Sequence, residues 1–402
     1  MTAAPTTIAA TRLEVAGHSV LLTFGPGLET VAEEIDTLWS HLLSADDDGA
    51  TPQIRLDYAL AGGDLPAGTV PLQARPEASY TISGHLIREV IRRLIGTRLL
   101  LHAGAVAHPE LGTLVLVGAS GAGKSTASSM LGRGGAYLTD ELTIITPGSF
   151  TLTPYPKPVS KHDPELGAKR DLALPGLGLR AADEAAAPAP AMVLLLERIR
   201  DEDEPEEGSS VTRVPLAEAL TRIVPQTSSL WALPGGLATL AELLNSVGGA
   251  LEVRYREAAE LEELLRRLPP AEHAETAEIE PRPGDVVTWE DTAPAPGRIA
   301  AVPFRQALAM ESGLFLLGEH GAIHLPGLAG LVWDLLADAG PLTFDQLEQL
   351  VVEEIGEHPE STALVRGTVS DLVAHGWARR GLSGGEDAPA QHRHQLLHPL
   401  GE

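Results

Sequence analysis

The sequence predicts an α/β protein with a larger N-terminal part and a smaller C-terminal α+β part. Short apolar runs typical of buried strands alternate with amphipathic segments over roughly the first two thirds of the 402-residue chain. A proline-rich stretch then precedes a second set of hairpin-like and helix-like segments. Apolar residues make up 44% of the chain, which suits a sizeable core and excludes general disorder. The expected parts are an N-terminal α/β portion (1–98), a core domain (99–268), a proline-rich linker (269–301), a C-terminal domain (302–382) and a flexible tail (383–402).

The composition excludes several classes of function. The 29 basic and 55 acidic residues give a net charge of −26, so most of the surface repels nucleic-acid phosphates. A small local phosphate site is still compatible with this charge, because it needs only a few backbone amides and one lysine. The chain has no cysteine, which removes disulfides, thiolate catalysis and cysteine-based metal sites. No apolar run approaches the ~20 residues of a membrane span, and the start lacks a signal-peptide pattern. We therefore expect a soluble cytoplasmic protein with neither nucleic-acid nor membrane partners.

The elements of the larger part follow from hydrophobic periodicity. Alternating and continuous apolar runs predict strands, and apolar positions at a spacing of 3.6 predict helices. The first elements are a strand or hairpin over 13–24, helices over 28–43 and near 82–95, and strands over 99–106 and 113–117. Further strands are expected at 136–138, 142–145, 192–196 and 251–255, with a helix over 259–268 and a solvated acidic loop over 201–207.

One motif in the sequence indicates a phosphate-binding site. The segment GASGAGKS between Gly118 and Ser125 fits the pattern GxxxxGK[ST], after a strand-like run and before a helix-like one. Small residues let the backbone curl so that successive N–H groups surround a β-phosphate, and the following helix adds its positive dipole end. Lys124 is expected to reach the β- and γ-phosphates of ATP, and the Ser125 hydroxyl to hold the bridging Mg²⁺. The residues predicted to bind the nucleotide are Gly118, Ala119, Ser120, Gly121, Ala122, Gly123, Lys124, Ser125 and Thr126.

An acidic pair follows the motif. Asp140 and Glu141 stand in AYLTDELTII, between two strand-like runs. Adjacent residues on a strand face opposite sides, so both carboxylates reach the phosphates only if the chain turns there. One carboxylate would then accept the proton of an attacking hydroxyl while the other holds Mg²⁺, directly or through water. A solvent-facing turn without a chemical role is the alternative.

The lysines are unusually distributed. All four lie between Lys124 and Lys169, and arginine supplies the positive charge elsewhere. Lysine is a compact, flexible point charge that suits phosphate oxygens. Lys157, in TPYPKPVSKH, either contacts phosphate or substrate or is an ordinary surface lysine in a proline-rich turn. For Lys161 and Lys169, a chance position in an arginine-biased sequence explains their place as well as a role at phosphate does.

His102 stands in the apolar run LLHAGAV, where a lone histidine is most often a core residue. However, LLHAGAVA, LVLVGASGAGKST and LTDEL in this order resemble the HPr kinase/phosphorylase family and its bacterial HPr-kinase-like relatives, loosely over 1–268 and well over 99–146. The resemblance implies that His102 assists at the phosphate and that Asp140 is the catalytic acid/base. Glu141 stands where the family usually has a second aspartate. The family's downstream Gly-Arg-Asn element is not found, so phosphorylase activity and recognition of HPr do not carry over.

The C-terminal part has its own resemblance. GAIHL followed by LAGLVWDLL is similar to PqqD-like domains, which bind leader peptides of ribosomally made, modified peptides by strand addition. A generic winged-helix-like module is the alternative. DNA binding is disfavoured, because residues 303–402 hold five arginines, no lysine and fourteen acidic residues. The expected elements are a hairpin over 314–325 with its turn at Gly318–Gly321, and helices over 328–336, 343–355 (with Thr343 as N-cap) and 362–375.

These features together predict an ATP-dependent, Mg²⁺-requiring kinase that phosphorylates a side-chain hydroxyl, with serine as the expected acceptor. The substrate would be a precursor peptide whose leader is held by residues of about 303–381. Fusion of the two parts would give that peptide a high effective concentration at the site. The alternatives are a small-molecule kinase and a non-catalytic ATP-dependent chaperone or scaffold of a peptide-modifying complex. A homo-oligomer is left open.

Overall fold

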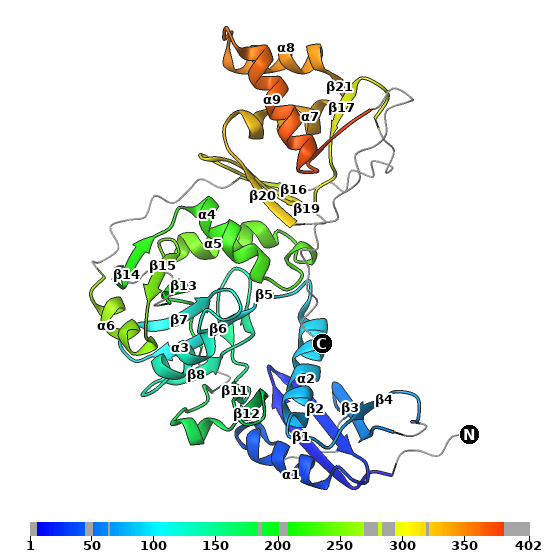
Figure 1. Cartoon of the computed structure of the whole chain (residues 1–402), viewed down its shortest axis with the longest axis vertical. Helices are drawn as coiled ribbons and strands as arrows, with labels where there is room; N and C mark the ends of the chain where they lie inside the picture. The colour runs from blue at the N-terminus through cyan, green and yellow to red at the C-terminus, as the bar shows by residue number, and fades with distance from the viewer. Residues whose placement is uncertain are drawn as a thin grey trace. The chain divides into compact units, whose positions relative to one another are not determined.

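The protein has a mixed α/β structure with several sheets and helices, as a computed structural model describes it (Figure 1). Its described residues form two compact units, Met1–Pro234 with Leu243–Ala274 and Gly235–Glu242 with Glu275–Glu402. In the described chain no helix has the length and apolar character required to cross a membrane. The structure describes residues 6–44, 51–62, 65–183, 187–200, 208–268, 280–283 (backbone only), 294–318 and 321–381.

The first unit begins with a four-stranded sheet in the order β1-β2-β3-β4, in which β1 and β2 form the expected hairpin. The two predicted helices are present as α1 and α2, and their apolar sides join this sheet in one core. Strands β3 and β4 escaped prediction because they lie in an irregular stretch rich in glycine and proline. The bounds are β1 Ala9–Val15, β2 His18–Phe24, α1 Glu29–Leu38, a 3₁₀ turn Ser40–Leu42, β3 Ile54–Leu60, β4 Thr69–Leu72 and α2 Ala78–Leu94.

A six-stranded sheet in the order β14-β15-β13-β7-β6-β8 forms the centre of the first unit (Figure 1). Strands β15, β13 and β7 are parallel, whereas β6 runs antiparallel to both β7 and β8. Apolar residues of α3 and α6 pack against this sheet. The bounds are β6 Ala103–His108, β7 Gly112–Val117, α3 Lys124–Leu131, β8 Ala136–Thr139, β13 Met192–Arg198, β14 Ser210–Arg213, β15 Leu251–Tyr255, a 3₁₀ turn Ala258–Glu260 and α6 Leu261–Arg266.

The single strand predicted over 99–106 is wrong at His102. The chain leaves one sheet and enters another there: β5 (Leu99–Leu101) pairs with β9 (Thr143–Ile145) in the sheet β10-β9-β5, whereas β6 pairs with β7. At the break, the His102 backbone N–H donates to the Gln226 carbonyl at 2.6 Å. A continuous apolar run cannot reveal this break, because both strands are buried.

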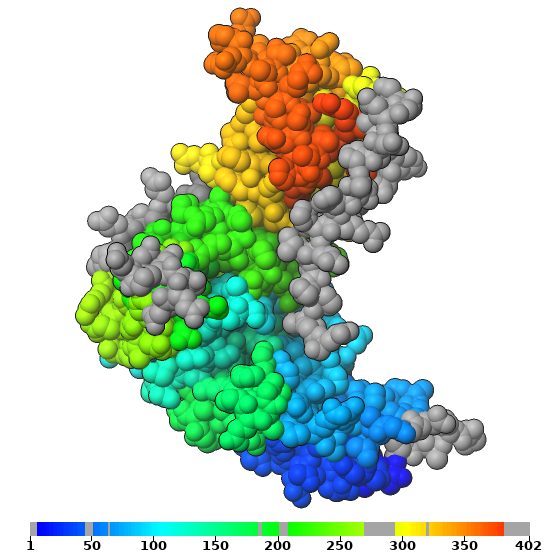
Figure 2. All heavy atoms as spheres, in the orientation of Figure 1, coloured from blue at the N-terminus to red at the C-terminus, as the bar shows by residue number. Residues whose placement is uncertain are grey.

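The remaining elements of the first unit were not predicted. A hairpin of β11 and β12 projects at the surface beside α2, where Figure 2 shows it in green. These elements are β10 Leu152–Thr153, β11 Val159–Asp163, β12 Ala168–Leu172, a 3₁₀ helix Leu174–Leu177, α4 Leu216–Ile223, 3₁₀ turns Val224–Gln226 and Leu230–Ala232, and α5 Gly236–Ser246, whose first part belongs to the second unit.

The second unit contains the predicted hairpin, as β19 and β20, and the three predicted helices α7, α8 and α9. Thr343 caps α8, because its hydroxyl accepts from the Gln346 N–H while the Gln346 side chain accepts from the Thr343 N–H. The predicted linker 269–301 includes strands β16 and β17 of this unit, whose prolines and alanines carry no strand signal. The bounds are β16 Glu280–Pro283, β17 Arg298–Ala301, β18 Gln306–Met310, β19 Gly313–Gly318, β20 Gly321–Leu325, α7 Leu328–Ala339, β21 Leu342–Thr343, α8 Phe344–Ile355, α9 Ser361–Ala374 and β22 Ala378–Arg380.

Two predicted features lie outside the described residues. These are the acidic loop over 201–207 and the tail over 383–402.

Candidate functional site

The residues that the sequence singled out lie together along one edge of the six-stranded sheet, namely the edge formed by the carboxyl ends of β7 and β8 and the start of β6. Strand β7 ends at Val117, which pairs with the first residue of β6, Ala103, and β8 ends at Thr139, which pairs with Ala105. The residues just outside these positions therefore lie along one edge: His102 before β6, the GASGAGKS segment after β7, and the acidic pair after β8. Loops at the carboxyl ends of parallel strands are the usual place for ligands in such sheets.

The segment from Gly118 to Gly123, called the 118–123 loop below, turns tightly between β7 and α3. Gly123 has a φ of +88°, a left-handed conformation that favours glycine. A side chain there would also meet Tyr255, because its Cβ would lie 2.5 Å from the Tyr255 hydroxyl. That hydroxyl donates to the Ala122 carbonyl at 2.7 Å and so fastens the loop to the end of β15. The glycines of the motif are thus required by close packing as well as by backbone conformation.

Lys124 is the first residue of α3 and lies across this loop. Its side chain is nearly buried, and Nζ donates to the carbonyls of Gly118 at 2.7 Å and Ala119 at 3.3 Å. Burial lowers the pKa of Lys124, while the negative charges of Glu141 and Asp140 act in the opposite direction. The Lys124 ammonium therefore lies against the loop at the N-terminal end of α3, and the N-terminus of a helix favours an anion.

The chain bends at Asp140 and Glu141, so both carboxylates turn toward the same cation, Lys157. Lys157 Nζ lies 3.3 Å from Asp140 Oδ1 and 3.1 Å from Glu141 Oε2. Asp140 Oδ1 also accepts from the Tyr137 hydroxyl at 2.8 Å. Asp140 is 3% exposed and Lys157 is 1% exposed. The interpretation of the acidic pair as a solvent-facing turn is therefore wrong, and so is that of Lys157 as an ordinary surface lysine. Of the two carboxylates, Glu141 is the more accessible.

Lys157 stays charged in this buried position. Burial would lower its pKa, but the charges of Asp140, Glu141 and Asp171 outweigh that effect and raise it above its ordinary value. Its ammonium also donates to Ser160 Oγ at 3.0 Å. A buried lysine needs such compensation, because an unpaired charge in the interior is strongly unfavourable.

A chain of hydrogen bonds continues from Lys157 into neighbouring elements. Ser160 of β11 donates to Asp171 Oδ1 at 2.7 Å, and Ser83 of α2 donates to Asp171 Oδ2 at 2.6 Å. Burial raises the pKa of Asp171, although Lys157 and the two hydroxyls oppose that shift. The acidic pair is thereby connected to both the β11–β12 hairpin and α2.

His102 is half-buried at the same sheet edge. Burial lowers its pKa most, and the charge of Lys124 lowers it further. The charges of Glu141 and Asp140 raise the pKa, and that of Lys169 lowers it. His102 therefore lies within the electrostatic influence of the loop lysine and the acidic pair.

The predicted metal ligands form no site by themselves. Within the described ranges, no three or more His, Cys, Asp or Glu side chains come together as a metal site. Ser125 is half-buried next to the 118–123 loop, and Glu141 is held by Lys157. This donor set fits an ion that nucleotide phosphates also coordinate, because Mg²⁺ retains waters and needs few protein ligands.

Sequence reasoning missed several residues at this edge. Arg200, just beyond β13, approaches the loop, since its guanidinium lies 3.7 Å from the position of a Cβ on Gly121. The tethering role of Tyr255 and the hydrogen bond of Tyr137 were also not foreseen. The one available signal was the scarcity of lysine, which pointed to Lys157 without revealing its partners.

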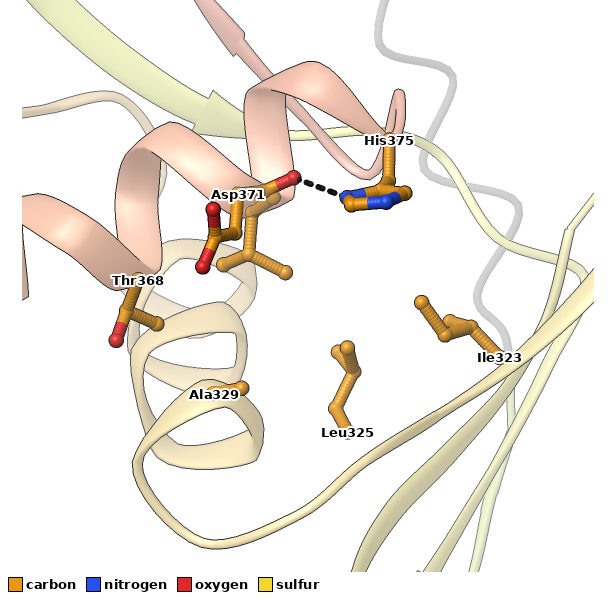
Figure 3. Close-up of a pocket in the computed structure, with 7 residues that line it drawn as sticks. Ile323, Leu325, Ala329, Thr368, Asp371 and His375 are labelled. Carbon is orange, nitrogen blue, oxygen red and sulfur yellow. Dashed lines mark hydrogen bonds between the residues drawn. The ribbon is translucent and has the colours of Figure 1, made fainter.

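The second unit has a pocket of its own. Figure 3 shows it between β20, α7 and α9, with a largely apolar floor and a polar rim. On the rim, His375 Nδ1 lies 2.8 Å from the backbone carbonyl of Asp371. Among the described strands, β20 is an edge strand of its four-stranded sheet and lies next to this pocket. The residues lining the pocket are Ile323, Leu325, Ala329, Thr368, Asp371, Leu372 and His375.

Comparison with known proteins does not assign the chain to a family. No family model matches the chain, and no curated protein shows significant similarity to it.

Proposed function

We propose that the protein is an ATP-dependent kinase that transfers a γ-phosphoryl group to a side-chain hydroxyl, expected to be serine, of a precursor peptide. One observation carries the proposal: Lys124 lies across the 118–123 loop at the sheet edge that also holds Asp140 and His102. Phosphoryl transfer needs mainly positioning and electrostatic stabilisation, so an anion site beside a carboxylate is a sufficient arrangement.

The roles of the residues follow from their positions. The amides of the 118–123 loop and the Lys124 ammonium bind the β- and γ-phosphates of ATP. Ser125 and Glu141 would hold Mg²⁺, which when bound neutralises phosphate charge. Asp140 accepts the proton of the acceptor hydroxyl while the hydroxyl oxygen bonds to the γ-phosphorus of ATP. The bond between the γ-phosphorus and the bridging oxygen breaks, and ADP leaves with its electrons.

The buried network gives Asp140 a fixed orientation. Tyr137 and Lys157 both engage its Oδ1 atom, so Oδ2 is the oxygen left for the acceptor hydroxyl. Lys157 is then a positioning residue, because it acts through the carboxylate and not on the phosphate. His102, with its lowered pKa, is uncharged at neutral pH and can donate the N–H of its ring to a phosphate oxygen.

The pocket of the second unit supports a peptide substrate. An extended leader would add to the edge strand β20 through backbone hydrogen bonds and insert an apolar side chain into the pocket over Leu325 and Ala329. Such docking does not involve the phosphate site and would supply substrate at a high effective concentration.

The test is to incubate the full chain with ATP, Mg²⁺ and candidate leader-bearing precursor peptides and to measure phosphopeptide by mass spectrometry. We expect one added phosphate with the wild-type chain and none with Lys124→Ala. Arg75→Ala, which removes an exposed cation ahead of α2, is the matched control and should retain activity. Phosphorylation of small molecules alone would indicate a small-molecule kinase. Leader binding without phosphopeptide would indicate a scaffold.

A further inference from the structure

Arg200 is a cation beside the 118–123 loop that the mechanism above does not use. Its side chain is exposed, and a guanidinium nitrogen lies 3.7 Å from the position that a Cβ on Gly121 would occupy. Within the part of the chain that the structure describes, this guanidinium forms no hydrogen bond or ion pair. A guanidinium has five N–H donors, which suit the oxygens of a phosphate. All of these donors are therefore available to a ligand at the loop.

The position of Arg200 follows from the packing of β13 against β7. The two strands are parallel, and Leu195 pairs with Val117, the last residue of β7. A Cβ on Gly118 would lie 3.1 Å from the Leu196 carbonyl, so the end of β13 runs close to the start of the loop. Because β13 lies between β7 and β15, the segment that carries Arg200 begins at an inner strand of the sheet.

The proposed base and Arg200 lie on different sides of the loop. In the sheet order β13-β7-β6-β8, the loop follows β7, Arg200 follows the neighbouring strand β13, and Asp140 follows β8 on the other side (Figure 1). In an in-line displacement, the attacking and leaving oxygens lie on opposite sides of the γ-phosphorus. An acceptor hydroxyl beside Asp140 would therefore direct the leaving oxygen and the β-phosphate of ATP toward Arg200.

We propose that Arg200 binds the β-phosphate of ATP and the oxygen that bridges it to the γ-phosphorus, an inference that rests on the kinase function above. As the acceptor oxygen bonds to the γ-phosphorus, the bond to the bridging oxygen breaks, and its electron pair stays on ADP. Asp140 takes the proton of the acceptor hydroxyl. The Arg200 guanidinium donates to the oxygens that gain negative charge, and such hydrogen bonds strengthen in the transition state and so lower the barrier.

The test compares Arg200→Ala and Arg200→Lys with the wild-type full chain. Arg213→Ala is the matched control, because Arg213 is an exposed arginine of the same sheet. It pairs with Leu251, the first residue of β15, and so lies at the opposite end of the strands from the loop. Isothermal titration in the presence of Mg²⁺ gives the Kd of ATP, ADP and AMP. The kcat is measured for phosphorylation of a leader-bearing precursor peptide.

We expect Arg200→Ala to lower kcat about 10³-fold, at the lower end of the effect of an arginine that stabilises this kind of transition state. ATP and ADP should both bind about tenfold more weakly, as expected for the loss of charged hydrogen bonds. AMP has no β-phosphate, so its Kd should not change. Arg200→Lys should recover part of the affinity but less of kcat, because lysine keeps the charge without the planar fork. The control should match the wild-type chain in every measurement.

Three results in Arg200→Ala would overturn the proposal. An unchanged Kd for ADP would show that Arg200 does not contact the β-phosphate. A loss of affinity confined to ATP would assign Arg200 to the γ-phosphate, and a loss shared by AMP would assign it to the α-phosphate or the nucleoside.

The binding data separate this inference from the kinase function. If the wild-type chain binds ADP but phosphorylates no peptide, the kinase function fails, whereas a weaker ADP affinity in Arg200→Ala with unchanged AMP affinity still supports the β-phosphate contact. If the wild-type chain binds neither ATP nor ADP, both proposals are overturned.

Discussion

Lys157 Nζ lies 3.3 Å from Asp140 Oδ1, and the two side chains are 1% and 2% exposed. A charge pair this deeply buried is balanced: each partner compensates the desolvation of the other. The pair joins the end of β8 to the segment that leads into the β11–β12 hairpin, so it couples the orientation of the proposed base to the fold around it. Loss of either partner should therefore affect both stability and chemistry.

Lys157→Met should destabilise the first unit by about 3–5 kcal/mol, because it leaves the Asp140 carboxylate buried without its cation. The double variant Lys157→Met/Asp140→Asn should recover part of this loss, since the uncompensated charge is removed as well. Free energies of unfolding from urea titrations of the single and double variants give the coupling. A coupling energy near zero would mean that the two side chains do not form the pair described.

Lys124→Ala should weaken ATP binding by about tenfold to a hundredfold, as expected for the loss of charged hydrogen bonds to phosphate. Phosphoryl transfer should fall below detection. Isothermal titration with ATP and Mg²⁺ measures the first effect. Near-normal turnover of this variant would remove the 118–123 loop from the mechanism.

The two carboxylates can be separated by amide substitutions. Asp140→Asn should lower kcat by about 10²–10⁴-fold while ATP affinity changes little, because the amide cannot accept the proton. Glu141→Gln should chiefly raise the Mg²⁺ concentration needed for half-maximal rate. Steady-state kinetics across a Mg²⁺ series distinguish the two effects. If Glu141→Gln showed the larger loss of kcat, the more exposed carboxylate would be the base, and the two roles would be reversed.

Local patterns predicted much of the fold, whereas contacts between distant segments escaped prediction. The strand, loop and helix around Lys124 and the N-cap at Thr343 depend on neighbouring residues, and the structure has both. The ion pair of Lys157 with Asp140 depends on the path of the chain between them. The break at His102 depends on which sheet each half joins.

His102 should contribute to the pH dependence of stability. Burial and the Lys124 charge lower its pKa below the ordinary 6.5, so just below pH 6.5 the unfolded chain binds a proton that the folded chain does not. Stability therefore falls as the pH drops from 6.5 to the folded pKa. Burial lowers the pKa of His41 and His85 as well, so the wild-type slope has several sources. His102→Gln should reduce this slope between about pH 7.5 and 5.5, as measured by chemical denaturation. An unchanged slope would contradict the lowered pKa.

The last prediction concerns the pocket beside β20. Ala329→Met would fill the pocket from α7, so the full chain should bind leader-bearing peptide less well, with KM raised about tenfold or more and kcat changed less. The proposed phosphate site lies in the first unit and is not changed by this substitution, so ATP affinity and turnover of a leaderless serine peptide should stay the same. Leu364→Met changes an exposed side chain on α9 that does not line the pocket and is the matched control. If Ala329→Met left the KM for leader-bearing peptide unchanged while the variant remained folded by circular dichroism, the pocket would not be the leader site. Strand addition uses backbone groups, which the substitution does not alter. A leader effect on KM that persists in the variant would then point to backbone pairing with β20 without a side chain in the pocket.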